Sequence, residues 1–294
     1  MGLSQVSRIK RMVIAVLLVA VIAGLLGVAL LFYQGRQRPD TSAEYVALGS
    51  SFAAGLGLGP RVPGSPIVCQ RSVNGYPQQL ARMTGLSLSD MSCSGATASH
   101  VVRGGQMFLG PQIDALGPET RLVTLTAGGN DVAYVGDLTA MAFRQRGGVT
   151  GFLVGQFWSG ARPVADRNFD ALRADFLATL REIRRRAPKA RIYVVTYPVI
   201  LPPEGSCPAL GIGADDAELM RQVGARLAQV TLEAANEAGA TVIDMDELSA
   251  GHDACSNEAW VNGAKPSEGA PFHPTLAGAR AAATAIHDIE KGLK

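Results

Sequence analysis

Charged and aromatic residues are scarce in this chain of 294 residues, at 18% and 6%, whereas apolar residues make up 47%. Such a composition supplies a sizeable core and excludes intrinsic disorder as a description of the whole chain. Acidic residues are absent before Asp40, although five basic residues stand there. The rest of the chain therefore has 22 basic against 25 acidic side chains, a formal charge of −3. This charge lacks the basic footprint of a nucleic-acid-binding protein, so no nucleic-acid partner is expected.

Cysteine is also sparse. The chain has four, Cys69, Cys93, Cys207 and Cys255, and none stands at the close paired spacing of a zinc site. In an oxidising compartment, two disulfides are the natural interpretation. Of the three possible connectivities we favour Cys69 with Cys93 and Cys207 with Cys255, since each pair brackets one long irregular stretch. Four buried thiols are the alternative.

One long apolar run is present, at residues 12–33, where no charged residue occurs. At about 1.5 Å per residue, a helix of this length crosses the roughly 30 Å hydrocarbon core of a bilayer. The pattern predicts a transmembrane signal anchor at 12–33, a cytoplasmic basic segment at 1–11 and a linker at 34–43. A cleaved signal peptide is the alternative, although its apolar region is usually about 7 to 15 residues long. We expect everything after the linker to lie outside the cytoplasm.

Strand-like and helix-like patterns alternate after the linker. Short strand-like segments predict strands at 45–48, 86–91, 122–126, 192–196 and 241–245. Apolar residues recur every three or four positions from Phe169 to Ile183 and from Leu219 to Val230, which is typical of amphipathic helices. This alternation over residues 44–294 predicts a single α/β domain with a parallel sheet.

The residues after the predicted strands are candidates for chemistry, because ligands of parallel sheets bind beyond the carboxyl ends of the strands. Taken singly, these residues have structural explanations as helix caps, turn glycines or an ordinary loop histidine. Together they offer a hydroxyl nucleophile, hydrogen-bond donors and a general base at one edge of the sheet. They are Ser50 and Ser51 after the first strand, Gly95 after the second, Gly128, Gly129, Asn130 and Asp131 after the third, and His273 and Pro274 before the last helix.

These blocks resemble the SGNH or GDSL hydrolases, a family of serine esterases and lipases. The resemblance covers roughly residues 44–290 and is carried by 46–51, Gly95, 128–131 and the His273, Pro274 pair. It implies a flavodoxin-like, three-layer α/β/α sandwich with a five-stranded parallel sheet. Ala53 stands where the second glycine of G-x-S-x-G would be, which disfavours the α/β-hydrolase fold.

The resemblance also implies roles for individual residues. Ser51 is expected to be the nucleophile and His273 the general base. The backbone N–H groups of Ser51 and Gly95 and the side-chain amide of Asn130 are expected to form the oxyanion hole, without metal or cofactor. Asp131 needs no chemical role, because capping the helix that follows it explains it.

The implied activity is hydrolysis of a carboxylic ester, either of a lipid or of another acyl group in the cell envelope. A carbohydrate O-acetylesterase and an envelope acyltransferase are the enzymatic alternatives. An inactive hydrolase fold that serves as a membrane-anchored binding module is the alternative of another class.

Two positions depart from the family pattern. Ser50 stands where the family usually has Asp before the nucleophile, and Ala270 stands three residues before His273, where the family has its acid. We therefore predict a dyad, in which the backbone carbonyl of Ala270 orients His273. The competing acids are Glu268 and Asp253.

The segment 141–161 combines large apolar side chains with several glycines, which predicts a mobile apolar flap. Such a flap would form one wall of an acyl pocket or lie against the membrane surface. Ordinary core packing is the alternative. The apolar side chains are Phe143, Phe152, Leu153, Phe157 and Trp158.

Overall fold

The structure is a computed structural model and describes residues 3–293. Its five-stranded sheet has the order β2-β1-β3-β4-β5, and every neighbouring pair is parallel. The predicted α/β domain with a five-stranded parallel sheet is therefore confirmed. The strands are β1 (Tyr45–Gly49), β2 (Leu88–Asp90), β3 (Leu122–Thr126), β4 (Arg191–Val195) and β5 (Thr241–Ile243).

The fifth strand is shorter than predicted because a helix begins directly after it. Asp244 caps α9 (Met245–Leu248), and its carboxylate accepts a hydrogen bond of 3.4 Å from the Glu247 N–H. The chain therefore leaves the sheet at Ile243, two residues before the predicted end.

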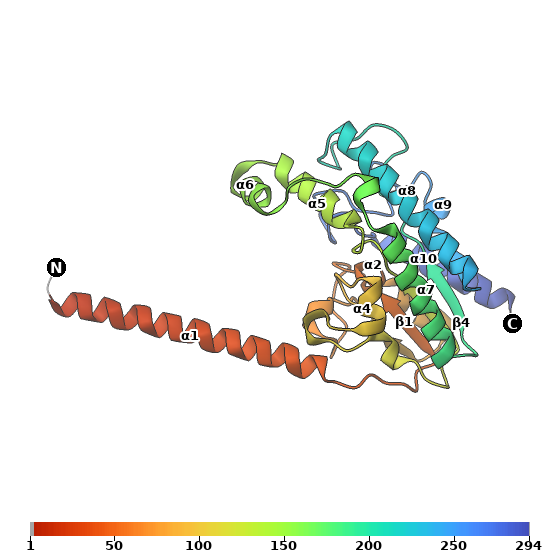
Figure 1. Cartoon of the computed structure of the whole chain (residues 1–294), viewed down its shortest axis with the longest axis horizontal. Helices are drawn as coiled ribbons and strands as arrows, with labels where there is room; N and C mark the ends of the chain where they lie inside the picture. The colour runs from red at the N-terminus through yellow and green to blue at the C-terminus, as the bar shows by residue number, and fades with distance from the viewer. Residues whose placement is uncertain (1–2, 294) are drawn as a thin grey trace.

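Helices cover both faces of the sheet and make three layers. One face packs against α3 (Tyr76–Thr84) and α10 (Leu276–Gly292). The other packs against α4 (Ala98–Arg103), α7 (Phe169–Arg186) and α8 (Ala214–Glu237). Figure 1 shows α7 and α8 in front of the sheet and α10 behind it. The two predicted amphipathic helices are confirmed as α7 and α8.

Alternate residues of β1 enter the two cores, as the period of a strand requires. Tyr45 and Ala47 lie in the core beneath α3 and α10, whereas Val46 and Leu48 lie in the core beneath α7 and α8. Every residue of β1 is buried, which explains why this segment is apolar throughout rather than alternating.

The segment 141–161 is largely helical. It contains the end of α5 (Tyr134–Gln145) and all of α6 (Gly148–Phe157), which projects from the domain in Figure 1. Gly151 is buried where α6 crosses α5, and a Cβ there would lie 2.9 Å from the carbonyl oxygen of Arg144. Only glycine permits this close approach, so the packing of α6 on α5 requires the glycine at position 151.

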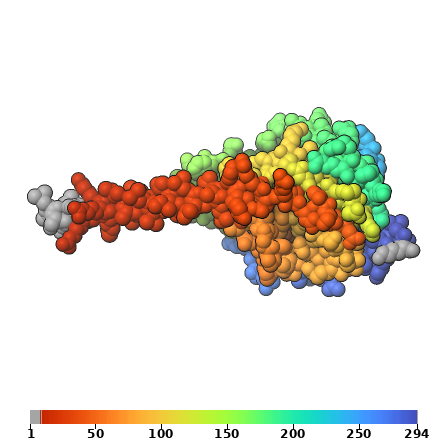
Figure 2. Space-filling view, turned by 90° about the horizontal axis from the view of Figure 1, so that it is seen from below, coloured from red at the N-terminus to blue at the C-terminus, as the bar shows by residue number. Residues whose placement is uncertain are grey.

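Helix α1 (Leu3–Gly35) extends away from the domain (Figures 1 and 2). Its part Lys10–Gly35 is long and apolar enough to cross a membrane, a test that a signal sequence also passes. The predicted span at 12–33 lies within it. The end of α1 contacts the domain through Phe32 and Phe108, whose ring centroids lie 6.1 Å apart.

Both predicted disulfides are present, Cys69–Cys93 and Cys207–Cys255. The first ties the chain before Gly95 to a short 3-10 helix. The remaining elements are α2 (Ser51–Ala54), η1 (Ile67–Cys69), η2 (Gln106–Phe108), η3 (Gln112–Ala115) and η4 (Val164–Asp166).

Candidate active site

Ser51 lies at the start of α2, directly after β1. Before it, Gly49 has a φ of 131°, and a Cβ there would lie 2.1 Å from the carbonyl oxygen of Thr126 on β3, so the turn requires glycine. Ser50 is the N-cap of α2, and Ser51 is its first residue. Ser51 is therefore not a helix cap. Its N–H belongs to the first turn, where backbone N–H groups have no intrahelical acceptor.

The imidazole of His273 lies against the hydroxyl of Ser51. The Nε2 atom is 2.8 Å from Ser51 Oγ, and Nδ1 is 2.7 Å from the carbonyl oxygen of Pro271. Because a carbonyl only accepts hydrogen bonds, Nδ1 carries the proton in the neutral ring, and Nε2 accepts from the hydroxyl. This is the tautomer that a general base for Ser51 requires.

The backbone carbonyl that contacts the imidazole is that of Pro271, so the prediction of Ala270 is wrong. The carbonyl of Ala270 instead accepts a hydrogen bond of 3.3 Å from the backbone N–H of His273. Phe272 between them is fully buried and has a φ of 56°. This left-handed residue turns the chain sharply, and the side chain of His273 folds back onto the nearer carbonyl.

Neither competing acid has a hydrogen bond to the imidazole. The carboxylate of Asp253 accepts a hydrogen bond of 2.8 Å from the Cys255 N–H, and Glu268 is exposed.

His273 itself is only 7% exposed. Burial lowers the pKa of its imidazole below the ordinary 6.5, while the hydrogen bond to Pro271 acts in the opposite direction. The ring is therefore neutral, and able to accept a proton, throughout the neutral pH range.

The predicted oxyanion donors face the same cavity as Ser51 and His273. Gly95, with a φ of 82°, follows the disulfide-bonded Cys93, and Asn130 follows β3. The Nδ2 atom of Asn130 donates a hydrogen bond of 2.8 Å to the carbonyl oxygen of Ala96. This bond orients the amide and leaves its second hydrogen for another acceptor.

Tyr197, which follows β4, is a residue of this site that sequence reasoning missed. Its hydroxyl accepts a hydrogen bond of 3.1 Å from the Gly129 N–H and lies 3.0 Å from Ser50 Oγ. Burial raises its pKa to about 12, so the hydroxyl keeps its proton and can donate to Ser50. Tyr197 thereby joins the segment before Ser51 to the segment before Asn130. Its position just after a strand was the available signal.

Aromatic packing completes the support of the histidine. The Phe52 ring lies 4.5 Å from the ring of Tyr197 and 5.0 Å from the imidazole of His273, measured between centroids. Phe52 is buried on α2, next to Ser51. The imidazole is therefore contacted by a packed side chain as well as by the Pro271 carbonyl.

Asp131 caps a different helix from the one predicted. Its carboxylate accepts hydrogen bonds of 3.2 and 3.0 Å from the N–H of Ala98, the first residue of α4, rather than from the helix that follows it in sequence. Burial raises the pKa of this carboxyl to about 6. Asp131 thus connects the loop after β3 to the loop that contains Gly95.

The cavity at Ser51 has a volume of about 280 Å³ and two chemically different parts. Ser51, His273 and the amide of Asn130 are polar, whereas Phe52, Leu56 and Val135 supply apolar surface. The other lining residues are Ser94, Gly95, Gly129, Gly136, Thr139 and Tyr197. Within residues 3–293, no group of three or more His, Cys, Asp or Glu side chains could hold a metal ion.

Comparison with known proteins finds relatives that span the domain. The model of the GDSL-like lipase/acylhydrolase family matches residues 47–281. Lipase 2 of Streptomyces coelicolor is 35% identical over 258 residues, covering 84% of this chain and 85% of the relative. A lipase of Streptomyces rimosus is 29% identical over 240 residues, covering 81% and 82%.

Two solved structures have a similar fold over nearly their whole length. Phospholipase A1 from Streptomyces albidoflavus NA297 aligns with a TM-score of 0.66 at 25% identity, covering 84% of this chain and 99% of that protein. The extracellular lipase from Streptomyces rimosus aligns with a TM-score of 0.66 at 25% identity, covering 83% and 98%. The sheet and its covering helices therefore have counterparts in experimentally determined lipase structures.

Proposed function

The chain belongs to the GDSL-like lipase/acylhydrolase family and is a carboxylic ester hydrolase, and from this premise we propose that it cleaves lipid acyl esters outside the cytoplasm. In this proposal Ser51 forms an acyl-enzyme and His273 is the general base. The observation that carries it is the hydrogen bond of 2.8 Å between His273 Nε2 and Ser51 Oγ, at a cavity with an apolar wall.

In the first half of the reaction, Nε2 of His273 removes the Ser51 proton as Oγ attacks the ester carbonyl carbon. The oxyanion accepts hydrogen bonds from the N–H groups of Ser51 and Gly95 and from the amide of Asn130. When the C–O bond to the alcohol breaks, the imidazolium returns its proton to the leaving oxygen. The products of this half are a free alcohol and acyl-Ser51.

In the second half, His273 takes a proton from water while the water oxygen attacks the acyl carbon. A second oxyanion forms at the same donors and collapses, the Ser51 oxygen recovers the proton, and a carboxylic acid leaves. The Pro271 carbonyl holds the Nδ1 proton throughout. As a neutral acceptor it stabilises imidazolium less than a carboxylate would, so we propose a dyad rather than a triad.

A lipid ester is favoured over a small acetyl ester by the apolar side of the cavity. Phe52, Leu56 and Val135 line it, and such surface gains free energy from contact with an acyl chain. The similar proteins named above as lipases and as a phospholipase A1 support the same substrate class. A carbohydrate acetylesterase and an acyltransferase are the alternatives that a substrate panel distinguishes.

We also propose that α1 retains the enzyme at a membrane. Residues 12–33 would span the bilayer, 1–11 would stay in the cytoplasm, and the linker 34–43 would lead to the hydrolase domain 44–294. Two disulfides and the similarity to an extracellular lipase support an oxidising location for the domain. Cleavage after α1 is the competing outcome, which the N-terminal sequence of the mature protein decides.

The mechanism is tested by labelling the full-length protein with a fluorophosphonate probe. We expect labelling of the wild type and of Ser50→Ala, and none of Ser51→Ala. Labelling retained in Ser51→Ala would contradict the assignment of the nucleophile. An unlabelled wild type with both disulfides formed would instead favour the inactive binding module.

Substrate class is tested with a series of p-nitrophenyl esters of increasing acyl length. We expect kcat/KM to be larger for medium and long acyl chains than for acetate, because the longer chains cover the apolar wall. A preference for acetate would favour the acetylesterase. Transfer of the acyl group to an added alcohol faster than to water would favour the acyltransferase.

A further inference from the structure

Helix α6 has an outer face that is apolar and exposed. Val149, Phe152, Leu153 and Phe157 follow helical spacing on one side, with exposed side-chain fractions of 78%, 65%, 50% and 90%. The buried Gly151 packs on α5, so this face points away from the domain. A contiguous exposed patch of large apolar side chains marks an interaction surface.

The segment that carries this face has charge of one sign. Residues 138–165 contain no acidic residue and three arginines, Arg144, Arg146 and Arg162. The guanidinium carbon of Arg144 lies 5.8 Å from the centroid of the Trp158 ring, and that of Arg146 lies 4.6 Å from Phe143. An apolar helix flanked by arginines and aromatic rings is complementary to a lipid surface with anionic headgroups.

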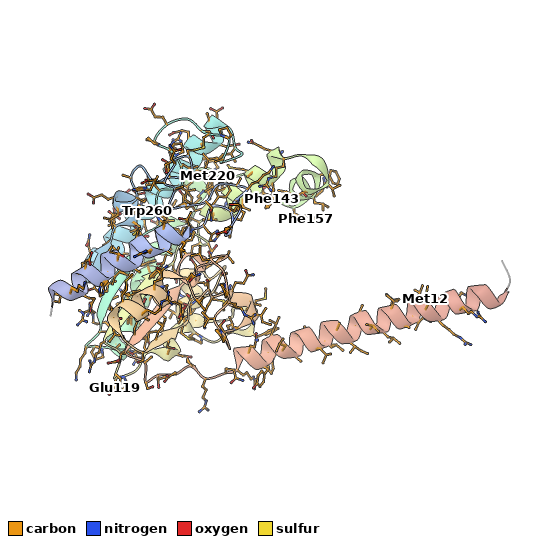
Figure 3. The ribbon with its side chains drawn as sticks, turned by 180° about the vertical axis from the view of Figure 1, so that it is seen from behind. Met12, Glu119, Phe143, Phe157, Met220 and Trp260 are labelled. Carbon is orange, nitrogen blue, oxygen red and sulfur yellow. A yellow bond between two sulfur atoms is a disulfide. The ribbon has the colours of Figure 1, made fainter. Side chains whose placement is uncertain are left out.

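The position of α6 relative to α1 identifies the membrane that it would meet. Figures 1 and 2 show α6 projecting from the domain toward the side on which α1 extends. In Figure 3 the labelled Phe157 lies on that same side of the domain. A second exposed apolar pair, Met107 and Phe108 in η2, lies beside Phe32 near the end of α1. Two exposed apolar surfaces of the domain, on α6 and on η2, therefore lie on the side from which α1 extends.

We propose that the outer face of α6, together with Met107 and Phe108, rests on the bilayer that α1 spans. This inference rests on the proposed anchoring by α1. The bilayer contact would affect the active site because α5 connects the two. Helix α5 lines the Ser51 cavity through Val135, Gly136 and Thr139, and it leads directly into α6. A bilayer contact at α6 would hold this wall of the cavity near the lipid surface, where an acyl ester could enter without crossing water.

The contact is tested by fluorescence quenching of the full-length chain in vesicles of phosphatidylcholine and phosphatidylglycerol with brominated acyl chains. The variants are Phe157→Trp and, as a control, Ile289→Trp on α10, near the C-terminus and away from α1 in Figure 1. Each is compared with the wild type, whose Trp158 and Trp260 give the background signal. We expect bromination to lower the added Phe157→Trp signal about twofold and to leave the Ile289→Trp signal unchanged.

The outcomes separate the α6 contact from the anchor. An unquenched Phe157→Trp signal in a chain that floats with the vesicles would overturn the α6 contact and leave the α1 anchor standing. A chain that does not float would overturn both. A third outcome is a Phe157→Trp fluorescence that bromination does not change, together with chemical cross-linking between copies of the chain. This would show that a second copy covers this face of α6, and it would also overturn the bilayer contact.

A second measurement separates the contact from the chemistry. In Phe152→Ser/Phe157→Ser, we expect the ratio of activity on a vesicle-embedded ester to activity on a soluble short-chain ester to fall about tenfold, since two exposed aromatic side chains that would enter the bilayer are lost. An unchanged ratio would overturn the functional consequence. Absence of activity on both esters in the wild type would overturn the proposed function, whereas the quenching result would remain as measured.

Discussion

The carboxyl edge of the sheet and helix α6 both present aromatic side chains, but in opposite environments. At the sheet edge, Phe52 and Tyr197 are buried and hold polar atoms at hydrogen-bonding distances around Ser51. On α6, Phe157 is 90% exposed. Proton transfer needs fixed directions, which packing and hydrogen bonds supply. Contact with a bilayer needs apolar area without a defined direction, so the residues of α6 need no such support.

The largest expected difference between the two regions is in kcat. His273→Ala removes the proposed base and should lower kcat on a soluble ester by on the order of 10⁴-fold or more, as loss of a triad histidine does. Phe157→Ser should change that kcat little. If both variants are folded by circular dichroism and lose kcat equally, α6 and the sheet edge do not differ in their contribution to the chemistry.

Loss of an oxyanion donor should have the next largest effect. Asn130→Ala should lower kcat about 10²- to 10³-fold with little change in KM, because its amide would meet charge that develops only in the transition state. Asn74→Ala is the matched control, since the Asn74 amide also donates to a backbone carbonyl, that of Leu58, and does not line the Ser51 cavity. Comparable kcat losses in the two variants would point to a structural role for Asn130.

Removal of one buried hydroxyl tests how the sheet edge is aligned. Tyr197→Phe keeps the ring on Phe52 but loses the hydrogen bonds to Ser50 and Gly129. We expect kcat to fall about tenfold and the free energy of unfolding to fall by about 1 to 3 kcal/mol. The effects of Tyr197→Phe and Ser50→Ala should not add in the double variant, because both remove the same contact. Additive effects on kcat would show that Tyr197 acts independently of Ser50.

The dyad predicts small effects at the neighbouring carboxylates. Asp253→Ala and Glu268→Ala should each lower kcat less than about tenfold, or about 1.4 kcal/mol, because neither side chain contacts the imidazole. Asp253→Ala also removes a hydrogen bond within the loop closed by Cys255, so the thermal midpoint is measured in parallel. A thousandfold loss in a folded variant would identify a third catalytic member.

The remaining prediction concerns stability at the sheet edge rather than kcat, and it depends on pH. The folded pKa of Asp131 is raised from the ordinary 3.8 to about 6, so the folded chain binds more protons than the unfolded chain between these values. The associated stabilisation is complete below about pH 4 and is lost as the pH rises through 6. Asp131→Asn keeps an acceptor for Ala98 without the charge. Its Tm relative to the wild type should therefore be higher at pH 8 than at pH 4, and an unchanged difference would contradict the raised pKa.

Some features of the fold and of the candidate site could be predicted because they depend on local patterns. Strand β1 is apolar throughout since both of its faces are covered, and α7 and α8 follow the helical period. Ser51 and Asn130 were candidates because they stand in the short segments that follow strands, and the resemblance to the SGNH hydrolases implied their roles. Tyr197 has the same position but was missed, since a tyrosine after a strand suggests core packing as readily as a hydrogen-bonding role.

Other features depend on the backbone conformation of single residues and on contacts between loops that are distant in sequence. Whether the Ala270 or the Pro271 carbonyl meets the imidazole is decided by the left-handed conformation of Phe272, a conformation that bulky residues rarely adopt. Asp131 likewise caps α4, which is distant in sequence, because the loops after β2 and β3 lie side by side. Propensity rules predicted a cap but not its partner, since they describe only neighbours along the chain.

Several features follow from the order of the residues alone: the alternation of strands and helices, the four cysteines available for pairing, the apolar run before the domain and the polar residues at the sheet edge. The folding of distant segments onto one another brings Ser51 and His273 together, 222 positions apart in the chain, and leaves the apolar side of α6 facing outward. The spacing of apolar residues along the chain specifies which face of a helix or strand is apolar. Which surface that face meets is set by packing between distant segments, and the direction of a hydrogen bond by the conformation of individual residues.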